Sequence, residues 1–385
     1  TIRMRCLAAV ALAATWVWTS VGASGDLQPK VKKPHLSGIF VAITTATSHW
    51  TTKQWTTDLT SMQDVGMTFA VLPHLAKQNT TKQIDTQCPL GYYTTLFNAT
   101  TLGPCFTQTG TTENGGTVET ILTAASSVGM ALQLGLATNG EIVTHDPGYN
   151  ATRAQDYAAL QWQLAQRLYQ IAIDMNRSHS VAGFYTEIEE YNAAWWLGVW
   201  NAWSLHYLGP VSTKIKSLRA DLLVWASPYS VGNLTKYEAN NIVDYELYGS
   251  IWGQVFDWAP DFDLVSPQDS MGAQGNSFQN VSDCLGNITL HGLHAERPRT
   301  TWSNVELFER WPYPTGNGRH PAQFARIQQQ IVNEWNVLQQ VGGISEPVLI
   351  AWEWYSCLSP NGGVDNKWAN VTKENYNRYK AWVMK

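Results

Sequence analysis

VAGFYTEIEE, at residues 181–190, is an aromatic and β-branched run that ends in three glutamates. Such a run favours a β-strand. Alternation along a strand gives it two sides, with Phe184, Thr186 and Ile188 on one and Tyr185, Glu187 and Glu189 on the other. Because an unpaired buried carboxylate is costly, we expect the apolar side to face the surrounding helices and the acidic side to face an opening. Glu190 suits the start of a following helix.

Seven further β-rich runs lie on either side of this stretch. They occupy residues 36–43, 68–76, 131–138, 222–229, 262–270, 299–309 and 346–355. Apolar residues at helical spacing follow several of these runs, as at Trp55, Leu59, Met62 and Val65. A Trp-rich helical region is expected from 193 to about 219, and the stretch before 262 is less regular. The sequence therefore alternates strand and helix eight times.

Eight such units, with no Pro/Gly/Ser-rich linker, predict one α/β domain over residues 25–385. The expected fold is a single (β/α)8 TIM barrel with elaborated βα loops. A doubly wound open sheet is the alternative, but no Gly-rich phosphate loop follows the first strand. In a barrel the active site lies at the carboxyl ends of the strands.

Polar side chains recur at these strand ends. Glu187 follows the fourth strand, Glu306 lies in the seventh, and both are the predicted catalytic residues. In the seventh run Trp302, Asn304 and Glu306 share one side. The expected substrate-binding residues come from five strands and are His74, Tyr185, Glu189, Gln268, Asp269, Asn304 and Glu353. We expect these side chains to converge on one crevice.

Two carboxylates across a pocket are the groups that cleave a glycosidic bond: one protonates the leaving oxygen, and the other attacks the anomeric carbon or activates water. Sugar rings stack on aromatic side chains, for which the candidates are Tyr185, Trp195, Trp196, Trp302 and Trp354. Most of the nineteen tryptophans are expected to be packing residues instead.

Other chemistries find less support in the sequence. His74 is the one histidine expected near the barrel mouth, and His291 and His294 are expected in a loop after the sixth unit. No HxH or HExxH spacing occurs at a strand end, so we predict no metal and no cofactor, with a carboxylate-bound ion as a weaker alternative. The sequence has no GxSxG motif for serine chemistry.

The beginning of the chain resembles a secretory signal. From Met4 a basic start is followed by an apolar stretch and small residues, which predicts a signal peptide over residues 1–24 cut near Ala23. We therefore expect a secreted protein without a membrane span, and a monomer. In a protein from a eukaryote, eight Asn-x-Ser/Thr acceptors are expected to mark glycosylated surface loops, at Asn79, Asn98, Asn150, Asn176, Asn233, Asn280, Asn287 and Asn370.

The number of cysteines and the net charge restrict which disulfides and which partners are expected. Beyond the signal, Cys88, Cys105, Cys284 and Cys357 suggest two disulfides, one of which would join Cys88 to Cys105. Free thiols for one pair remain the alternative. The formal charge of −5, without a Lys/Arg block, argues against nucleic acid as a partner. A carbohydrate substrate is the expected partner.

Several motifs, taken in order, resemble the family called domain of unknown function 4434, whose members are predicted to be glycoside-hydrolase-like barrels. They are LSGIF, MQDVGMTFAVL, GFYTEIEE, DLVSPQDSMG, NVELF and WEWYSCLSP. The arrangement is also similar to the large retaining clan of barrel glycosidases, with the acid/base after strand four and the nucleophile after strand seven. That resemblance implies Glu187 as acid/base and Glu306 as nucleophile. The clan has Asn before its acid/base, where this chain has Thr186.

Two functions are therefore expected in order of preference. The first is a secreted glycoside hydrolase that cleaves a poly- or oligosaccharide with two carboxylates. The second is a non-catalytic carbohydrate-binding barrel that has kept the cleft. Rim loops decide the substrate, notably the insertion from Lys77 to about Gly116 and the stretch RWPYPTGNGRHP.

Overall fold

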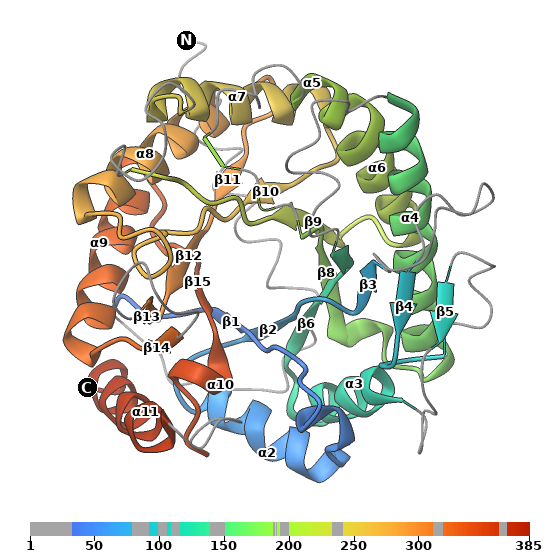
Figure 1. Ribbon diagram of the computed structural model, residues 1–385, viewed down its shortest axis with the longest axis vertical. Coiled ribbons are helices and arrows are strands. Elements are labelled where there is room, and N and C mark those ends of the chain that lie inside the picture. The colour runs from blue at the N-terminus through green and yellow to red at the C-terminus, as the bar shows by residue number, and fades with distance from the viewer. Residues whose placement is uncertain are drawn as a thin grey trace.

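A ring of parallel strands forms the centre of the computed structural model (Figure 1). The structure describes residues 33–78, 92–98, 106–108, 116–138, 151–187, 189, 191–192, 200–232, 242–310, 319–361 and 368–385. The ring strands are β1 (Gly38–Phe40), β2 (Phe69–Leu72), β6 (Ala131–Gly135), β8 (Val181–Tyr185), β9 (Leu223–Ala226), β10 (Leu264–Val265), β11 (Thr300–Thr301), β12 (Ser303–Glu306) and β15 (Leu349–Trp352). Every one of the eight predicted runs contributes to this ring.

The seventh run closes the ring. It is interrupted at Trp302, so that β11 pairs with β10 and β12 pairs with β15, both in parallel. An isolated bridge between Gln268 and Asn304 links the sixth run to the second half of the seventh. Each remaining strand pairs with its sequence neighbours, and β1 pairs with β15. The predicted (β/α)8 barrel is confirmed.

Helices surround this ring, as Figure 1 shows. The larger ones are α2 (Thr52–Gln63), α3 (Thr117–Val128), α4 (Ala151–Asp174), α6 (Gly209–Leu218), α7 (Tyr245–Trp258), α8 (Phe278–His294), α9 (Phe324–Gly342) and α11 (Ala369–Val383). Shorter pieces are α5 (Trp200–Trp203), a π-helical turn (Ser204–Leu208) and α10 (Trp354–Cys357). The stretch before the sixth strand, for which the sequence pattern was less regular, forms α7. His291 and His294 lie in the last turn of α8, so the expected loop there is wrong.

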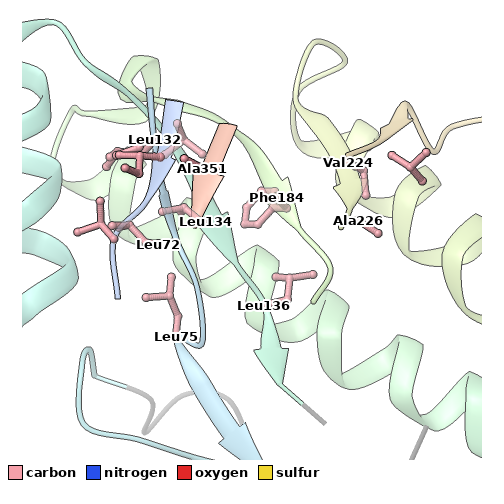
Figure 2. Close-up of a cluster of buried hydrophobic side chains, with 14 of the residues drawn as sticks. Leu72, Leu75, Leu132, Leu134, Leu136, Phe184, Val224, Ala226 and Ala351 are labelled. Carbon is pink, nitrogen blue, oxygen red and sulfur yellow. The ribbon is translucent and has the colours of Figure 1, made fainter. Parts of the chain in front are cut away.

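The side chains of the strands alternate between two cores. Leu72, Leu134, Phe184, Val224 and Ala351 point outward and pack under the helices (Figure 2). The inward set fills the barrel and consists of Phe40, Phe69, Val71, Tyr185, Leu223, Trp225, Leu264, Trp302 and Ile350. A packed interior leaves only the strand ends and their loops to form a site.

Two small sheets extend the barrel rim. The second and third predicted strands each split, because β3 (Ala76–Gln78) and β7 (Ala137–Thr138) leave the barrel and pair with each other. They join β4 (Tyr92–Thr94) and β5 (Phe106–Gln108) in a four-stranded sheet. A hairpin of β13 (Phe308–Arg310) and β14 (Arg319–Pro321) follows the seventh strand. These are the loop elaborations expected at the rim.

The structure corrects two expectations about side-chain chemistry. Cys284 and Cys357 are free, buried thiols rather than part of a disulfide, and burial raises the pKa of each to about 12. Cys88 and Cys105 lie outside the described residues, as does the predicted signal peptide. Asn280 and Asn287 belong to α8 and not to loops, and Asn280 takes part in the capping box of that helix. Within the described residues, no helix combines the length and the apolarity needed to cross a lipid bilayer.

Candidate functional site at the barrel mouth

Strand alternation sends Tyr185 of β8 and Asn304 and Glu306 of β12 toward the inside of the barrel. Tyr185 and Trp302 belong to the interior core, whereas Phe184 and Val305 belong to the outer one. Two and four residues beyond Trp302, the same alternation reaches Asn304 and Glu306 in β12. Glu187 lies beyond the end of β8 and has a φ of 51°, so alternation does not extend to it. The predicted division is therefore confirmed within β8 and β12, and the position of Glu187 follows from its contacts with His74 instead.

Glu187 is held by His74, which lies two residues after the end of β2. The backbone N–H of His74 donates to Glu187 Oε1, and His74 Nδ1 contacts Glu187 Oε2. The Glu187 side chain is 1% exposed and that of His74 is 37% exposed. Both residues have positive φ angles, 51° for Glu187 and 59° for His74, a conformation that non-glycine residues adopt only where their surroundings hold them.

Gly135 at the end of β6 makes room for this contact. A Cβ at that position would lie 2.6 Å from Glu187 Oε1 and 2.6 Å from the Leu72 carbonyl oxygen. Only glycine therefore fits between the second and fourth strands while Glu187 keeps its place. This requirement could be suspected from the sequence, because Gly135 interrupts an apolar strand.

Glu306 is the last residue of β12, and both its carboxylate and its backbone carbonyl accept hydrogen bonds. The backbone N–H of Ala273 donates to Glu306 Oε2 at 2.6 Å. The carbonyl oxygen of Glu306 accepts from Gln330 Nε2 and Arg326 Nη2 of α9, each at 3.2 Å. The residue is 2% exposed. The loop after β10 and the helix after β12 thus fix the position of this carboxylate.

Gln268 connects the polar groups of the fourth, fifth and sixth strands. Its Nε2 donates to the Ser227 carbonyl at 2.9 Å and lies 3.3 Å from Glu189 Oε1. Asn304 Nδ2 donates to Ser227 Oγ at 2.8 Å. Glu189 is exposed. These contacts bring Gln268, Glu189 and Asn304 together around Ser227 at the mouth.

Tyr185 lies below this network and keeps its proton. Burial, and then the negative charges of Glu189 and Glu187, raise the pKa of its hydroxyl well above the ordinary value. Its ring contacts Phe40 and Trp225, with centroids 5.2 Å and 4.8 Å away. Tyr185 is therefore a donor at the floor of the site rather than an exposed stacking surface.

The aromatic side chains at the barrel mouth are not the ones predicted from the sequence. Trp302 is buried in the barrel, and Trp354 is buried on the helix side, where its Nε1 donates to Asp58. Trp352 faces the mouth instead: it is half-buried, 4.8 Å from the Phe40 ring and 6.3 Å from the His74 ring between centroids. Trp195 and Trp196 lie outside the described residues. Tyr191 and Tyr229, missed by the sequence, stack at 5.0 Å on the rim.

Asp269 does not face the mouth. It occupies the outward side of its run, where Gln330 Nε2 and the Met271 N–H donate to its carboxyl group. Burial raises its pKa, and Glu334 of α9 lies beside it. Burial and the charge of Asp269 raise the pKa of Glu334 well above its usual range, and Ser303 Oγ donates to Glu334. The expectation that Asp269 binds substrate is replaced by a buried carboxyl pair.

Glu353 is the N-cap of α10 and not a free side chain at the rim. It accepts from the backbone N–H groups of Tyr355 and Ser356, each at 3.1 Å, and from Ser356 Oγ at 2.6 Å. Burial raises its pKa, and these hydrogen bonds oppose that change. The neighbouring Trp352 takes the inward direction, so the next residue turns away from the barrel axis.

Sequence reasoning missed the residues of α9 that support the site. Arg326, Gln330 and Glu334 recur every four residues beside the buried Ile327, Ile331 and Trp335. Polar groups at that spacing on a buried face were the available signal. For metal ions, the described part of the chain contains no group of three or more His, Cys, Asp or Glu side chains placed to hold one.

Comparisons with known proteins agree with the fold. A family model described as "Domain of unknown function (DUF4434)" matches residues 36–343, and no curated protein matches the chain. The chain is similar to the putative alpha-L-fucosidase from Bacteroides thetaiotaomicron VPI-5482, at 16% identity over 94% of this chain and 98% of that one, with a TM-score of 0.64. It is also similar to the endo-1,4-beta-D-mannanase from Thermotoga petrophila RKU-1, at 12% identity, 91% and 99% coverage and a TM-score of 0.53. Its fold is that of glycosidase barrels.

Proposed function

The chain belongs to the family described as domain of unknown function (DUF4434), and from this premise we propose that it is a glycoside hydrolase acting on a poly- or oligosaccharide. One observation carries the proposal. Glu306 lies on the inward side of β12 and Glu187 lies just beyond β8, at the same end of the barrel. Paired carboxylates across a barrel mouth are the groups that glycosidic cleavage requires.

In this proposal Glu187 stands on the side of the leaving oxygen, which must gain a proton. Glu306 stands on the opposite side, where its carboxylate attacks the anomeric carbon or takes a proton from the attacking water. Trp352 offers an aromatic face for a sugar ring, and Gln268, Asn304 and Glu189 offer hydrogen-bonding groups. The similarity of the fold to an endo-mannanase and a putative fucosidase supports a carbohydrate substrate.

Thr186 sets this mouth apart from the large retaining clan. Its Oγ1 donates to the Trp225 carbonyl at 3.1 Å, and the residue is fully buried. A side chain turned toward the neighbouring strand is in no position to bind a sugar hydroxyl. We therefore propose that Glu189 and Gln268 do this instead.

Export of the protein is part of the same proposal. The basic and apolar start of the sequence supports a cleaved signal peptide, and Asn98, Asn176 and Asn370 are exposed acceptor sites. Secretion would bring a monomeric barrel to extracellular glycans. Mass spectrometry of the secreted protein should find residues 1–24 removed and sugar attached to these asparagines.

A non-catalytic carbohydrate-binding barrel is the second candidate. The burial of both carboxylates, at 1% for the Glu187 side chain and 2% for Glu306, favours it. Product release from a panel of polysaccharides and aryl glycosides separates the two functions, with the double variant Glu187→Gln, Glu306→Gln beside the native protein. Cleavage by the native protein alone supports the hydrolase. Equal binding of one glycan to both proteins, with cleavage by neither, contradicts it.

A further inference from the structure

The buried Glu187 carboxyl group can act on a substrate through the side chain of His74. Both oxygens of Glu187 are engaged by His74, one by its backbone N–H and the other by Nδ1. With Glu187 as a carboxylate, which only accepts hydrogen bonds, Nδ1 is the donor in this contact. The Glu187 side chain is almost fully buried, while more than a third of the His74 side chain is exposed. His74 is therefore the exposed member of this contact and Glu187 the buried one.

The surroundings fix the orientation of the imidazole ring. Its Nδ1 side is held by Glu187, and the ring of Trp352 lies across it at 6.3 Å between centroids and 66° between planes. Gly135 keeps the space that Glu187 needs to reach His74. A histidine whose Nδ1 is bound by a carboxylate has a fixed tautomer and presents Nε2 for proton transfer.

We propose that His74 Nε2 delivers the proton to the leaving oxygen, with Glu187 as the positioning residue; this inference rests on the proposed function. The imidazolium gives its Nε2 proton to the glycosidic oxygen as the bond from that oxygen to the anomeric carbon breaks. The bond's electron pair stays on the oxygen, and a Glu306 carboxylate oxygen bonds to the anomeric carbon. Water then attacks that carbon, its proton passes to Nε2, and the electron pair of the ester bond returns to Glu306.

Leaving-group dependence tests the proposal. The substrates are the 2,4-dinitrophenyl and the phenyl glycoside of a sugar that the native protein cleaves. Protonation matters most for the poorer phenolate leaving group. We expect His74→Gly to lower kcat/KM for the phenyl glycoside by about a hundredfold or more, a usual effect of removing a general acid. The dinitrophenyl glycoside should lose far less.

Added imidazole should restore cleavage of the phenyl glycoside by His74→Gly, because the variant has space where the ring stood. It should not restore Glu187→Gln. His74→Asn is the fold control, since Asn tolerates the positive φ at this position and keeps the backbone donor; its melting temperature should match that of the native protein and its phenyl glycosidase activity should be lost.

These experiments distinguish a failure of the proposed role of His74 from a failure of the proposed function. Equal losses on both substrates without rescue by imidazole would overturn the role of His74 and leave the hydrolase intact. If the native protein cleaves no aryl glycoside or polysaccharide, the proposed function is wrong and the role of His74 falls with it.

Discussion

Glu306 faces the barrel mouth, whereas Asp269 and Glu353 do not, and strand alternation explains the difference. Glu306 shares a side with Trp302, an interior residue of its own run. Asp269 lies one residue after the inward Gln268, and Glu353 lies one residue after Trp352, so both point elsewhere. The side of each strand could be predicted for 181–190 and 299–309, where apolar and polar residues alternate. It could not be predicted for 346–355, where nearly every residue is apolar.

At the residue scale, Gly135→Ala should displace Glu187. The new Cβ would lie 2.6 Å from Glu187 Oε1 and 2.7 Å from Pro73 Cα, which is too close for backbone to adjust cheaply. We expect a loss of about 1–3 kcal/mol in the free energy of unfolding, as for other overpacked sites. Glycosidase activity should also fall. Denaturant unfolding and initial rates measure both effects.

Gly286→Ala is the matched control. This glycine lies in α8, and a Cβ there would be 3.7 Å from Val341 Cγ2, an ordinary contact. The variant should be as stable as the native protein or more stable by up to about 1 kcal/mol, because alanine favours helix. If Gly135→Ala behaves like Gly286→Ala, Glu187 does not need the space at residue 135.

At the element scale, α9 supports two strand ends from the outside of the barrel. Arg326 and Gln330 donate to the Glu306 carbonyl, and Gln330 also donates to Asp269. One helix thus sets the positions of the sixth and seventh strand ends relative to each other. Arg326 and Gln330 of α9 thus position Glu306 without contacting a substrate.

Gln330→Leu should therefore weaken both stability and activity. The substitution keeps a similar volume but leaves Asp269 and the Glu306 carbonyl with fewer donors inside the protein. We expect a loss of about 1–3 kcal/mol in the free energy of unfolding, with a lower kcat. Gln329→Leu, at the exposed neighbouring position, should change neither quantity. Equal behaviour of the two variants in thermal unfolding would contradict this role of α9.

The elements were predictable to different degrees. The ring strands and helices such as α2 and α9 carry strong local periodicity, and their existence follows from the sequence. The splitting of 68–76 and 131–138 depends on β3 pairing with β7, two segments about sixty residues apart. Local patterns carry no information about such pairing, so the outer sheet could not be foreseen.

At the scale of the whole molecule, burial raises the pKa of several acids. Among the described residues, burial raises the pKa of six carboxyl groups, at Asp58, Glu119, Asp263, Asp269, Glu334 and Glu353. That of Asp58 rises from 3.8 to about 6. Such a group retains a proton in the folded chain that the unfolded chain has lost. Its contribution to stability is complete below the ordinary pKa and is lost as pH rises through the folded one.

We therefore expect the free energy of unfolding to fall between pH 5 and pH 8. Burial lowers the pKa of His35, so the contribution of His35 to stability is lost as pH falls. This effect opposes the trend, but it comes from one group, whereas six carboxyl groups produce the trend. Glu334→Gln should reduce the fall, because the amide needs no proton. Urea unfolding at several pH values measures the slope. Stability that rises from pH 5 to pH 8 would contradict the prediction.

The most direct test of the central claim is the rate of glycoside cleavage by Glu306→Gln. The comparison protein is Glu374→Gln, which changes an exposed glutamate of α11 and should cleave like the native protein. Since the carboxylate would attack the anomeric carbon or activate water, we expect kcat/KM of Glu306→Gln to fall by about a hundredfold or more. The melting temperature should stay near that of the native protein. A folded Glu306→Gln that cleaves at the native rate would contradict a glycosidase centre built on Glu306.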